Sequence, residues 1–185
     1  MTYPWKNKYP STTQVLSPHI DFSMVPLTVL ELATARGSMV HDLCARHAQG
    51  EWIIPDLIRE DSKGYFDSFL QWFELVETVH LVEEELIDEV YGYCGHPDMI
   101  VTLIGTKWPR VVDLKTPVSR AKSWKLQIAG YSHLAKINGY HVKQSGTLRL
   151  SPKGRTPVYD EYTDSVEDFN IFLSCLMSWN FFNED

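Results

Sequence analysis

Apolar and polar residues alternate along this chain with two different periods, and the change of period predicts where helices give way to strands. Small or apolar side chains recur every three or four residues over 27–48, which predicts a long helix with Gly50 as its stop signal. A second helix is expected over about 65–78, with one apolar face formed by Phe66, Phe69, Leu70, Phe73 and Val76.

The segment before these helices has no such period. Residues 1–26 are rich in Pro, Ser and Thr, so we expect an irregular N-terminal arm in which Ser11-Thr12-Thr13 could cap a short turn.

Beyond about residue 79 the pattern is typical of strands. Residues 79–87 and 89–93 are expected to be strands, followed by the short segment Gly95-His96-Pro97. Residues 98–104 and 111–114 are apolar at nearly every position, which is typical of strands that are covered on both faces. These two segments are therefore expected at the centre of a sheet.

The remaining elements complete an α/β arrangement. A helix is expected over 120–137 with Asn138-Gly139 as its stop, then strands over about 141–150 and 156–162, and a closing amphipathic helix over about 165–181. The predicted fold is one α/β domain, 1–185, with a central mixed β-sheet flanked by helices. It comprises the arm (1–26), a core (27–162) and a C-terminal packing helix (163–185).

Composition narrows the class of protein. Apolar residues make up 44% and charged residues 22% of the 185 residues, which excludes a disordered or low-complexity chain. No apolar run approaches the ~18 residues of a membrane helix, and the first residues lack a signal peptide's apolar centre. Cys44, Cys94 and Cys175 lie far apart and fit neither a disulfide framework nor a four-thiolate metal site. We therefore expect no membrane association and a cytoplasmic location.

The net charge of −7 conceals a strong segregation of charge. Residues 101–155 contain eleven Lys or Arg and only one acid, Asp113, whereas the rest of the chain contains six bases and 23 acids. A basic segment around one carboxylate suits a protein that binds a polyanion and uses the acid for chemistry. A chance cluster on solvated faces explains the pattern equally well.

Asp98, Asp113 and Lys115 stand out because each lies in or beside a strand of Val, Ile and Leu. If 98–104 and 111–114 form an antiparallel hairpin that turns at Gly105-Thr106, Asp98 lies directly opposite Asp113, with Cβ atoms about 4.5–5.5 Å apart. Lys115 then lies on the same face. Pro109 could introduce a bulge and change this register.

Two carboxylates this close repel each other unless a cation lies between them, and hard oxygen ligands suit Mg²⁺ or Mn²⁺. A buried Asp–Lys ion pair beside a capping Asp is the alternative. His41 alone is weak evidence for a ligand, because a histidine on an apolar helix face usually belongs to the core. Gly37, one turn before it, would let the helix backbone approach the sheet closely.

At these residues the sequence resembles the PD-(D/E)XK nuclease superfamily, in its RecB-like exonuclease branch. Four motifs occur in the order of that branch: Gly37-Ser38-Met39-Val40-His41 (preceded by Arg36), Gly95-His96-Pro97-Asp98, Asp113-Leu114-Lys115-Thr116 and Gln127-Ile128-Ala129-Gly130-Tyr131. They span residues 36–131. The resemblance implies a restriction-endonuclease-like αβββαβ core, of the kind found in single-domain exonucleases of phages and prophages.

The resemblance also implies roles for individual residues. Asp98, Asp113 and the Leu114 carbonyl would bind Mg²⁺ or Mn²⁺, with His41 completing or adding a metal position. Lys115 would orient or help deprotonate the attacking water and balance charge on the scissile phosphate. DNA contacts are expected from Gln127, Tyr131, Arg36, Arg120 and Lys122.

Several residues keep a second interpretation. Gln127 and Tyr131 could shape the site or serve ordinary helix packing. Glu84 and Glu85 could supply a further carboxylate, although exposed charge at a sheet edge is the simpler interpretation. Trp108 and Trp124 could stack on unpaired bases or pack in the core. Some relatives in this branch carry an iron–sulfur cluster on four cysteines, but this chain has three, so no cluster is expected.

The function expected from sequence is a metal-dependent exonuclease that hydrolyses phosphodiester bonds in linear DNA. Its partners would be single- or double-stranded DNA and, in addition, a second copy of the chain or a recombination protein. Two alternatives stay open. One is a structure-specific endonuclease of the same fold, and the other is a non-cleaving DNA-binding or metal-stabilised subunit of a recombination or replication complex.

Overall fold

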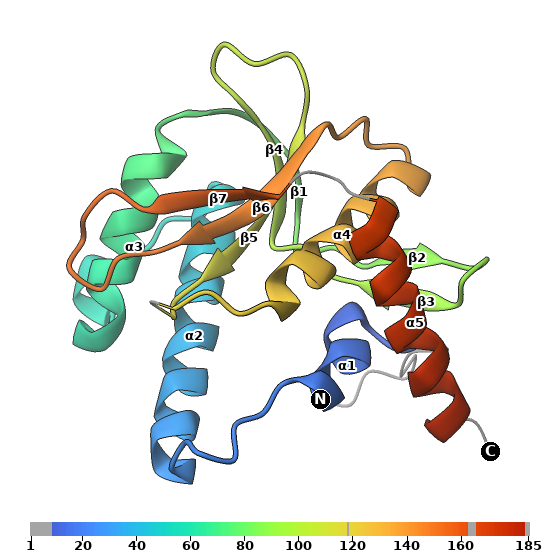
Figure 1. Ribbon diagram of the computed structural model, residues 1–185. Coiled ribbons are helices and arrows are strands. Elements are labelled where there is room, and N and C mark those ends of the chain that lie inside the picture. The colour runs from blue at the N-terminus through green and yellow to red at the C-terminus, as the bar shows by residue number, and fades with distance from the viewer. Residues whose placement is uncertain (1–8, 118, 163–165, 184–185) are drawn as a thin grey trace.

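A five-stranded mixed sheet forms the centre of the protein, as Figure 1 shows. The computed structural model describes residues 9–117, 119–162 and 166–183. The strand order is β1-β4-β5-β6-β7, and only the central pair β5–β6 is parallel. The strands are β1 (Val76–Val82), β4 (Met99–Leu103), β5 (Arg110–Lys115), β6 (Gln144–Arg149) and β7 (Val158–Tyr162).

Helices cover both faces of this sheet. They are α1 (Thr12–Leu16), α2 (Leu27–Ala48), α3 (Glu60–Phe73), α4 (Ser123–Ile137) and α5 (Val166–Asn183), with 3-10 turns η1 (Ser17–His19) and η2 (Pro55–Leu57). Residues of α2 and α3 share one buried cluster with Met99, Val101 and Val112, whereas residues of α1, α4 and α5 share another with Ile100 and Val111. The alternation along β4 and β5 thus divides the core into two layers, and the predicted α/β fold with a mixed central sheet is confirmed.

The middle of the sheet follows from the apolar runs in the sequence. Five of the six residues of β5 are buried, as expected for a strand covered on both faces. The chain returns from β5 to the parallel strand β6 through α4, because a parallel pair requires a crossover connection. The crossover brings the start of α4 beside the end of β5.

The predicted register of β4 and β5 is confirmed. Met99 pairs with Val112, Ile100 with Val111, and Val101 with Arg110, so the same register continued by one residue sets Asp98 opposite Asp113. The predicted tight hairpin is wrong, however, since pairing stops at Val101–Arg110.

The connection between these strands turns one residue earlier than predicted. The Thr106 N–H donates to the Leu103 carbonyl at 2.9 Å, and Gly105 takes up the positive φ of 76° that the third position of such a turn requires. Pro109 has no N–H to extend the ladder, so the strands separate there without a change of register.

The region between α3 and β4 differs most from the prediction. The helix expected over 65–78 is α3, Glu60–Phe73, and β1 already begins at Val76. The strand expected over 79–87 is divided at Glu83, whose φ is +49°, into the end of β1 and β2 (Leu86–Asp88).

Residues 89–92, part of the strand expected over 89–93, form a turn instead. The Asp88 carboxylate accepts hydrogen bonds from the N–H groups of Val90 and Tyr91, and Gly92 follows with a φ of +74°. The chain then returns as β3 (Tyr93–Gly95), which pairs with β2 in a separate hairpin.

The N-terminal arm is less irregular than predicted. Residues 1–8 lie outside the described residues, but Ser11 and Gln14 form a reciprocal capping box that starts α1. Val15 and Leu16 are almost fully buried, and the Thr12 hydroxyl donates to the Cys94 carbonyl at 3.0 Å. The start of the arm is therefore part of the core, because a capped turn can bury its apolar residues under α4 and α5.

The other predicted elements have the right type and order, and most of them have shorter or shifted bounds. The helix over 27–48 matches α2, and Gly50 and Gly139 take positive φ values after α2 and α4, as their stop role requires. The C-terminal helix is α5; residues 163–165 and 184–185 of the predicted C-terminal segment lie outside the described residues. Within the described ranges, every helix is too short or too polar to cross a membrane.

Candidate functional site

Asp98 and Asp113 lie at the same end of the central strands. Asp98 precedes β4 and is 8% exposed, and Asp113 lies within β5 and is 3% exposed. One oxygen of Asp98 accepts a hydrogen bond from the Leu114 N–H. The Leu150 N–H donates to the Lys115 carbonyl, so the backbone N–H and C=O of Lys115 face β6, and those of the preceding residue, Leu114, face Asp98. The Leu114 carbonyl points to that same side, as its predicted ligand role requires.

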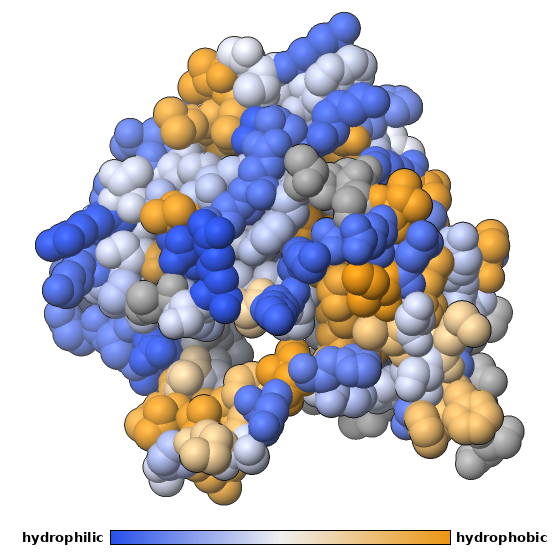
Figure 2. Space-filling model, in the orientation of Figure 1, coloured by the Kyte–Doolittle hydropathy of each residue, from blue (hydrophilic) through white to orange (hydrophobic). Residues whose placement is uncertain are grey.

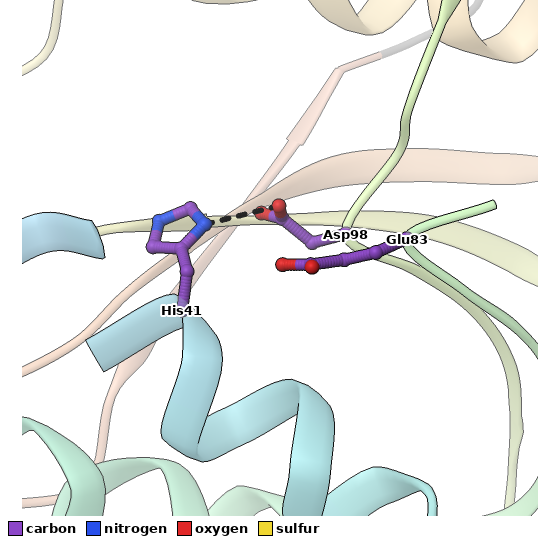
Figure 3. A group of neighbouring side chains, drawn as sticks. All are labelled: His41, Glu83 and Asp98. Carbon is purple, nitrogen blue, oxygen red and sulfur yellow. Dashed lines mark hydrogen bonds and ion pairs between the residues drawn. The ribbon is translucent and has the colours of Figure 1, made fainter. Parts of the chain in front are cut away.

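His41 reaches Asp98 from α2, which lies on the face of the sheet opposite α4. Its side chain projects from the middle of α2, is 30% exposed, and places Nδ1 3.0 Å from Asp98 Oδ1 (Figure 3). Burial lowers the pKa of His41, but the Asp98 carboxylate outweighs burial and raises that pKa to about 9. At neutral pH without a metal, the pair is an imidazolium and a carboxylate.

Lys115, Asp113 and Gln127 form a second, connected group. Lys115 Nζ lies 2.6 Å from Asp113 Oδ2 and donates to Gln127 Oε1 at 2.9 Å. The amide of Gln127 in turn donates to Asp113 Oδ1 and to the Tyr131 hydroxyl, both at 3.2 Å. Gln127 therefore fixes both the acid and the base of β5 from the first turns of α4.

Burial and charge act oppositely on the two acids. Burial raises the pKa of Asp113, and the nearby Asp98 carboxylate raises it further, although Lys115 opposes both effects. Burial also opposes ionisation of Asp98, but His41, its hydrogen bonds and Lys115 hold its pKa below the usual range. Such a site favours a bound cation, which would relieve the repulsion between the two carboxylates.

Glu83 is a site residue that sequence reasoning missed. His41, Glu83 and Asp98 each offer one ligand atom, and these atoms lie within 4.8 Å of one another (Figure 3). The Glu83 N–H donates to the Asp98 carbonyl at 3.1 Å, so the end of β1 lies beside Asp98. Glu83 and His41 also line a cavity of about 420 Å³ with Gly37, Ser38 and Asp42.

Asp113 does not belong to that group of three, and its oxygens contact Lys115 and Gln127 instead. The two carboxylates proposed from sequence, those of Glu84 and Glu85, do not belong to that group either. Glu84 and Glu85 are exposed, and Glu85 lies 3.7 Å from His96. The Glu83-Glu84-Glu85 run was a usable signal, but only the pairing of β1 with β4 identifies the member that faces Asp98.

The two motif glycines have different roles. A Cβ on Gly95 would lie 2.7–2.9 Å from Tyr131, Thr12 and Leu134, so this glycine is required for α1 and α4 to approach β3. A Cβ on Gly37 would meet its nearest atom, in Thr116, at 3.8 Å, which is an ordinary contact. The position of α2 at Gly37 therefore does not require a glycine.

The residues expected to contact DNA have different surroundings. Arg120 and Lys122 are exposed beside the start of α4. Gln127 is partly exposed within the network, whereas Tyr131 is only 4% exposed, which agrees with a role in shaping the site. Arg36 packs over the Tyr65 ring at 5.5 Å, and its Nε is buried without a hydrogen-bond partner.

The two tryptophans also differ. Trp124 is 8% exposed and lies under Lys115, whose Nζ is 5.6 Å from the ring centre. Trp108 is 42% exposed between Lys107 and Lys143, so its core-packing interpretation is wrong.

Comparisons with known proteins add little to this geometry. The chain matches no protein-family model and no curated protein. Among solved structures it is similar to one titled "Crystal structure of SSO0001", with a TM-score of 0.37 and 12% sequence identity over 80% of this chain and 87% of that one. A likeness this slight carries no argument about function.

Proposed function

We propose that the protein is a metal-dependent deoxyribonuclease that removes nucleotides from the ends of linear DNA. The observation that carries the proposal is the convergence of His41, Asp98, Asp113, Lys115 and Gln127, from four separate parts of the chain, on one end of the sheet. The same residues carry the resemblance to the PD-(D/E)XK nucleases.

The donor atoms fit a hard divalent cation. Asp98 and Glu83 offer carboxylate oxygens beside the His41 imidazole, and Asp113 holds a further buried carboxylate nearby. Oxygen-rich sets of this kind suit Mg²⁺, and the imidazole makes Mn²⁺ an equally good candidate. A cation bound there supplies Lewis-acid stabilisation of the negative charge that develops on a phosphate during hydrolysis.

Lys115 is the residue best suited to act on the phosphate. Its ammonium is held between Asp113 and Gln127 and is 15% exposed, so it can donate to a phosphate oxygen without a large rearrangement. Gln127 keeps that ammonium in position. Arg120 and Lys122 would hold the adjoining DNA backbone, which predicts binding that weakens strongly with salt.

The cytoplasm is the proposed location, because Cys44, Cys94 and Cys175 are all free thiols and an oxidising compartment would favour disulfides.

The substrate is tested with linear and closed circular DNA of one sequence, with Mg²⁺, Mn²⁺ or EDTA. The proposal predicts metal-dependent loss of the linear form while the circle survives. Cutting of the circle would replace the exonuclease with an endonuclease. Survival of every substrate under each metal would refute nuclease activity.

A further inference from the structure

A second cavity, of about 470 Å³, adjoins the proposed site, and Glu83 does not line it. Lys115 and Gln127 form part of its wall. Another part is the segment that joins α1 to α2, which contributes Ile20 and Phe22, and the rest includes Arg120 and Trp124 near the start of α4. Figure 2 shows this face of the molecule hollowed above that joining segment, which Figure 1 draws in blue.

The lining of this cavity combines aromatic rings with positive charge. Phe22 is 50% exposed, and Trp124 lies beneath the Lys115 ammonium. Among the described residues that line the cavity there are two cations, Lys115 and Arg120, and no Asp or Glu. The cavity beside His41, by contrast, is lined by Asp42 and Glu83. The cavity beside His41 thus suits a cation, whereas the cavity lined by Phe22 and Trp124 suits an anion that carries a flat, apolar group.

Arg120 is ion-paired, but its side chain is still 61% exposed. Its partner Asp160 is buried in β7 and is shared with Arg149, so one carboxylate faces two guanidinium groups. Ser123, the first residue of α4, also lines the cavity, and the N-terminus of a helix adds a favourable field for an anion.

We propose that this cavity binds the base of one unpaired nucleotide, in the DNA strand whose phosphate lies at Lys115. This inference rests on the proposed function and specifies its substrate. A volume of about 470 Å³ lies within the range of about 300–1,000 Å³ that is usual for small-molecule sites. Aromatic rings stack on any base, whereas a base-paired nucleotide cannot enter a cavity walled on several sides. The enzyme therefore acts on single strands or on frayed ends.

The test measures binding rather than cleavage. Short single-stranded oligonucleotides, intact or with one abasic position moved along the strand, are titrated with wild type and variants by fluorescence anisotropy, with Ca²⁺ in place of Mg²⁺. Phe22→Ala removes the half-exposed ring, and Phe22→Tyr retains an aromatic ring. Met24→Ala is the matched control, because Met24 is 92% exposed in the same segment and does not line the cavity.

We expect Phe22→Ala to weaken binding of the intact oligonucleotide by about five- to 100-fold, the effect of losing one base–aromatic stack. Phe22→Tyr and Met24→Ala should bind like wild type. One abasic position should abolish the difference between Phe22→Ala and wild type, since the base is then missing already.

Three results would overturn the inference: unchanged binding by Phe22→Ala, an equal loss at every abasic oligonucleotide, or no binding of DNA by wild type. If the protein cleaves linear DNA but no abasic position abolishes the effect of Phe22→Ala, the cavity inference fails and the proposed function stands. If one abasic position abolishes that effect but no DNA is ever cleaved, the proposed function fails and the cavity inference stands.

Discussion

The imidazole of His41 and the carboxylate of Asp98 lie 3.0 Å apart, although the two residues are 57 positions apart along the chain. The contact joins α2, which covers one face of the sheet, to the start of β4, and Glu83 completes a group of three donors around it. We therefore expect a cation to bind at this ion pair, where it would replace the proton on the His41 imidazole.

Metal affinity should therefore depend on pH through His41. Because the metal-free His41 has a pKa of about 9, the imidazole must lose a proton to become a ligand. Below pH 9 we therefore expect the apparent affinity for Mn²⁺ to rise by about tenfold for each unit by which the pH is raised. Isothermal titration calorimetry of wild type and His41→Gln across the neutral range measures it. Equal pH slopes in both proteins would remove His41 from the metal site.

Glu83 should matter more than its neighbour in sequence. Glu83→Gln removes one of the three grouped donors and should weaken Mn²⁺ binding by at least about tenfold, with little effect on folding, because Glu83 is exposed. Glu84→Gln is the matched control, since it also removes one exposed acid. Calorimetric titrations of both variants test the assignment, and equal losses would show that only the overall negative charge attracts the metal.

The two motif glycines should respond in opposite ways to substitution. Gly95→Ala forces a Cβ against Tyr131, Thr12 and Leu134 and should destabilise the protein by about 1–3 kcal/mol. Gly37→Ala has room for its methyl group and should stabilise α2 by up to about 1 kcal/mol. Urea unfolding of both variants measures these changes in the free energy of unfolding. A stable Gly95→Ala protein would mean that α1 and α4 do not press on β3 as described.

The sequence predicted the relation between Asp98 and Asp113 because an antiparallel hairpin centred on Gly105-Thr106 places these two residues opposite each other. The observed pairs, from Met99–Val112 to Val101–Arg110, keep that register, although the connection turns between Leu103 and Thr106. Pro109 lies beyond the last pair and does not shift the register. Local pattern and global fold agree at this point.

Other parts depend on contacts that no local pattern contains. The five residues of α1 are too few to show a helical period, so their burial was missed. Glu83 could not be distinguished from Glu84 and Glu85 until β1 was paired with β4. The cavity at Phe22 and Trp124 arises where the joining segment passes the start of α4, a juxtaposition of residues about a hundred positions apart that periodicity does not predict.

Lys115 and Asp113 are proposed to serve hydrolysis rather than to form a structural ion pair, and the rate at which Lys115 variants digest DNA distinguishes the two roles. End-labelled linear DNA is incubated with Mg²⁺ or Mn²⁺ and wild type, Lys115→Ala or Lys115→Gln, the last of which leaves Asp113 a hydrogen-bond donor. Circular dichroism melting checks that each variant folds.

We predict that wild type digests the DNA only with metal, and that both folded variants are slower by at least about 100-fold, the scale of losing a group that stabilises transition-state charge. Digestion by a folded Lys115→Gln at the wild-type rate would contradict this prediction and return Lys115 and Asp113 to the role of a buried ion pair.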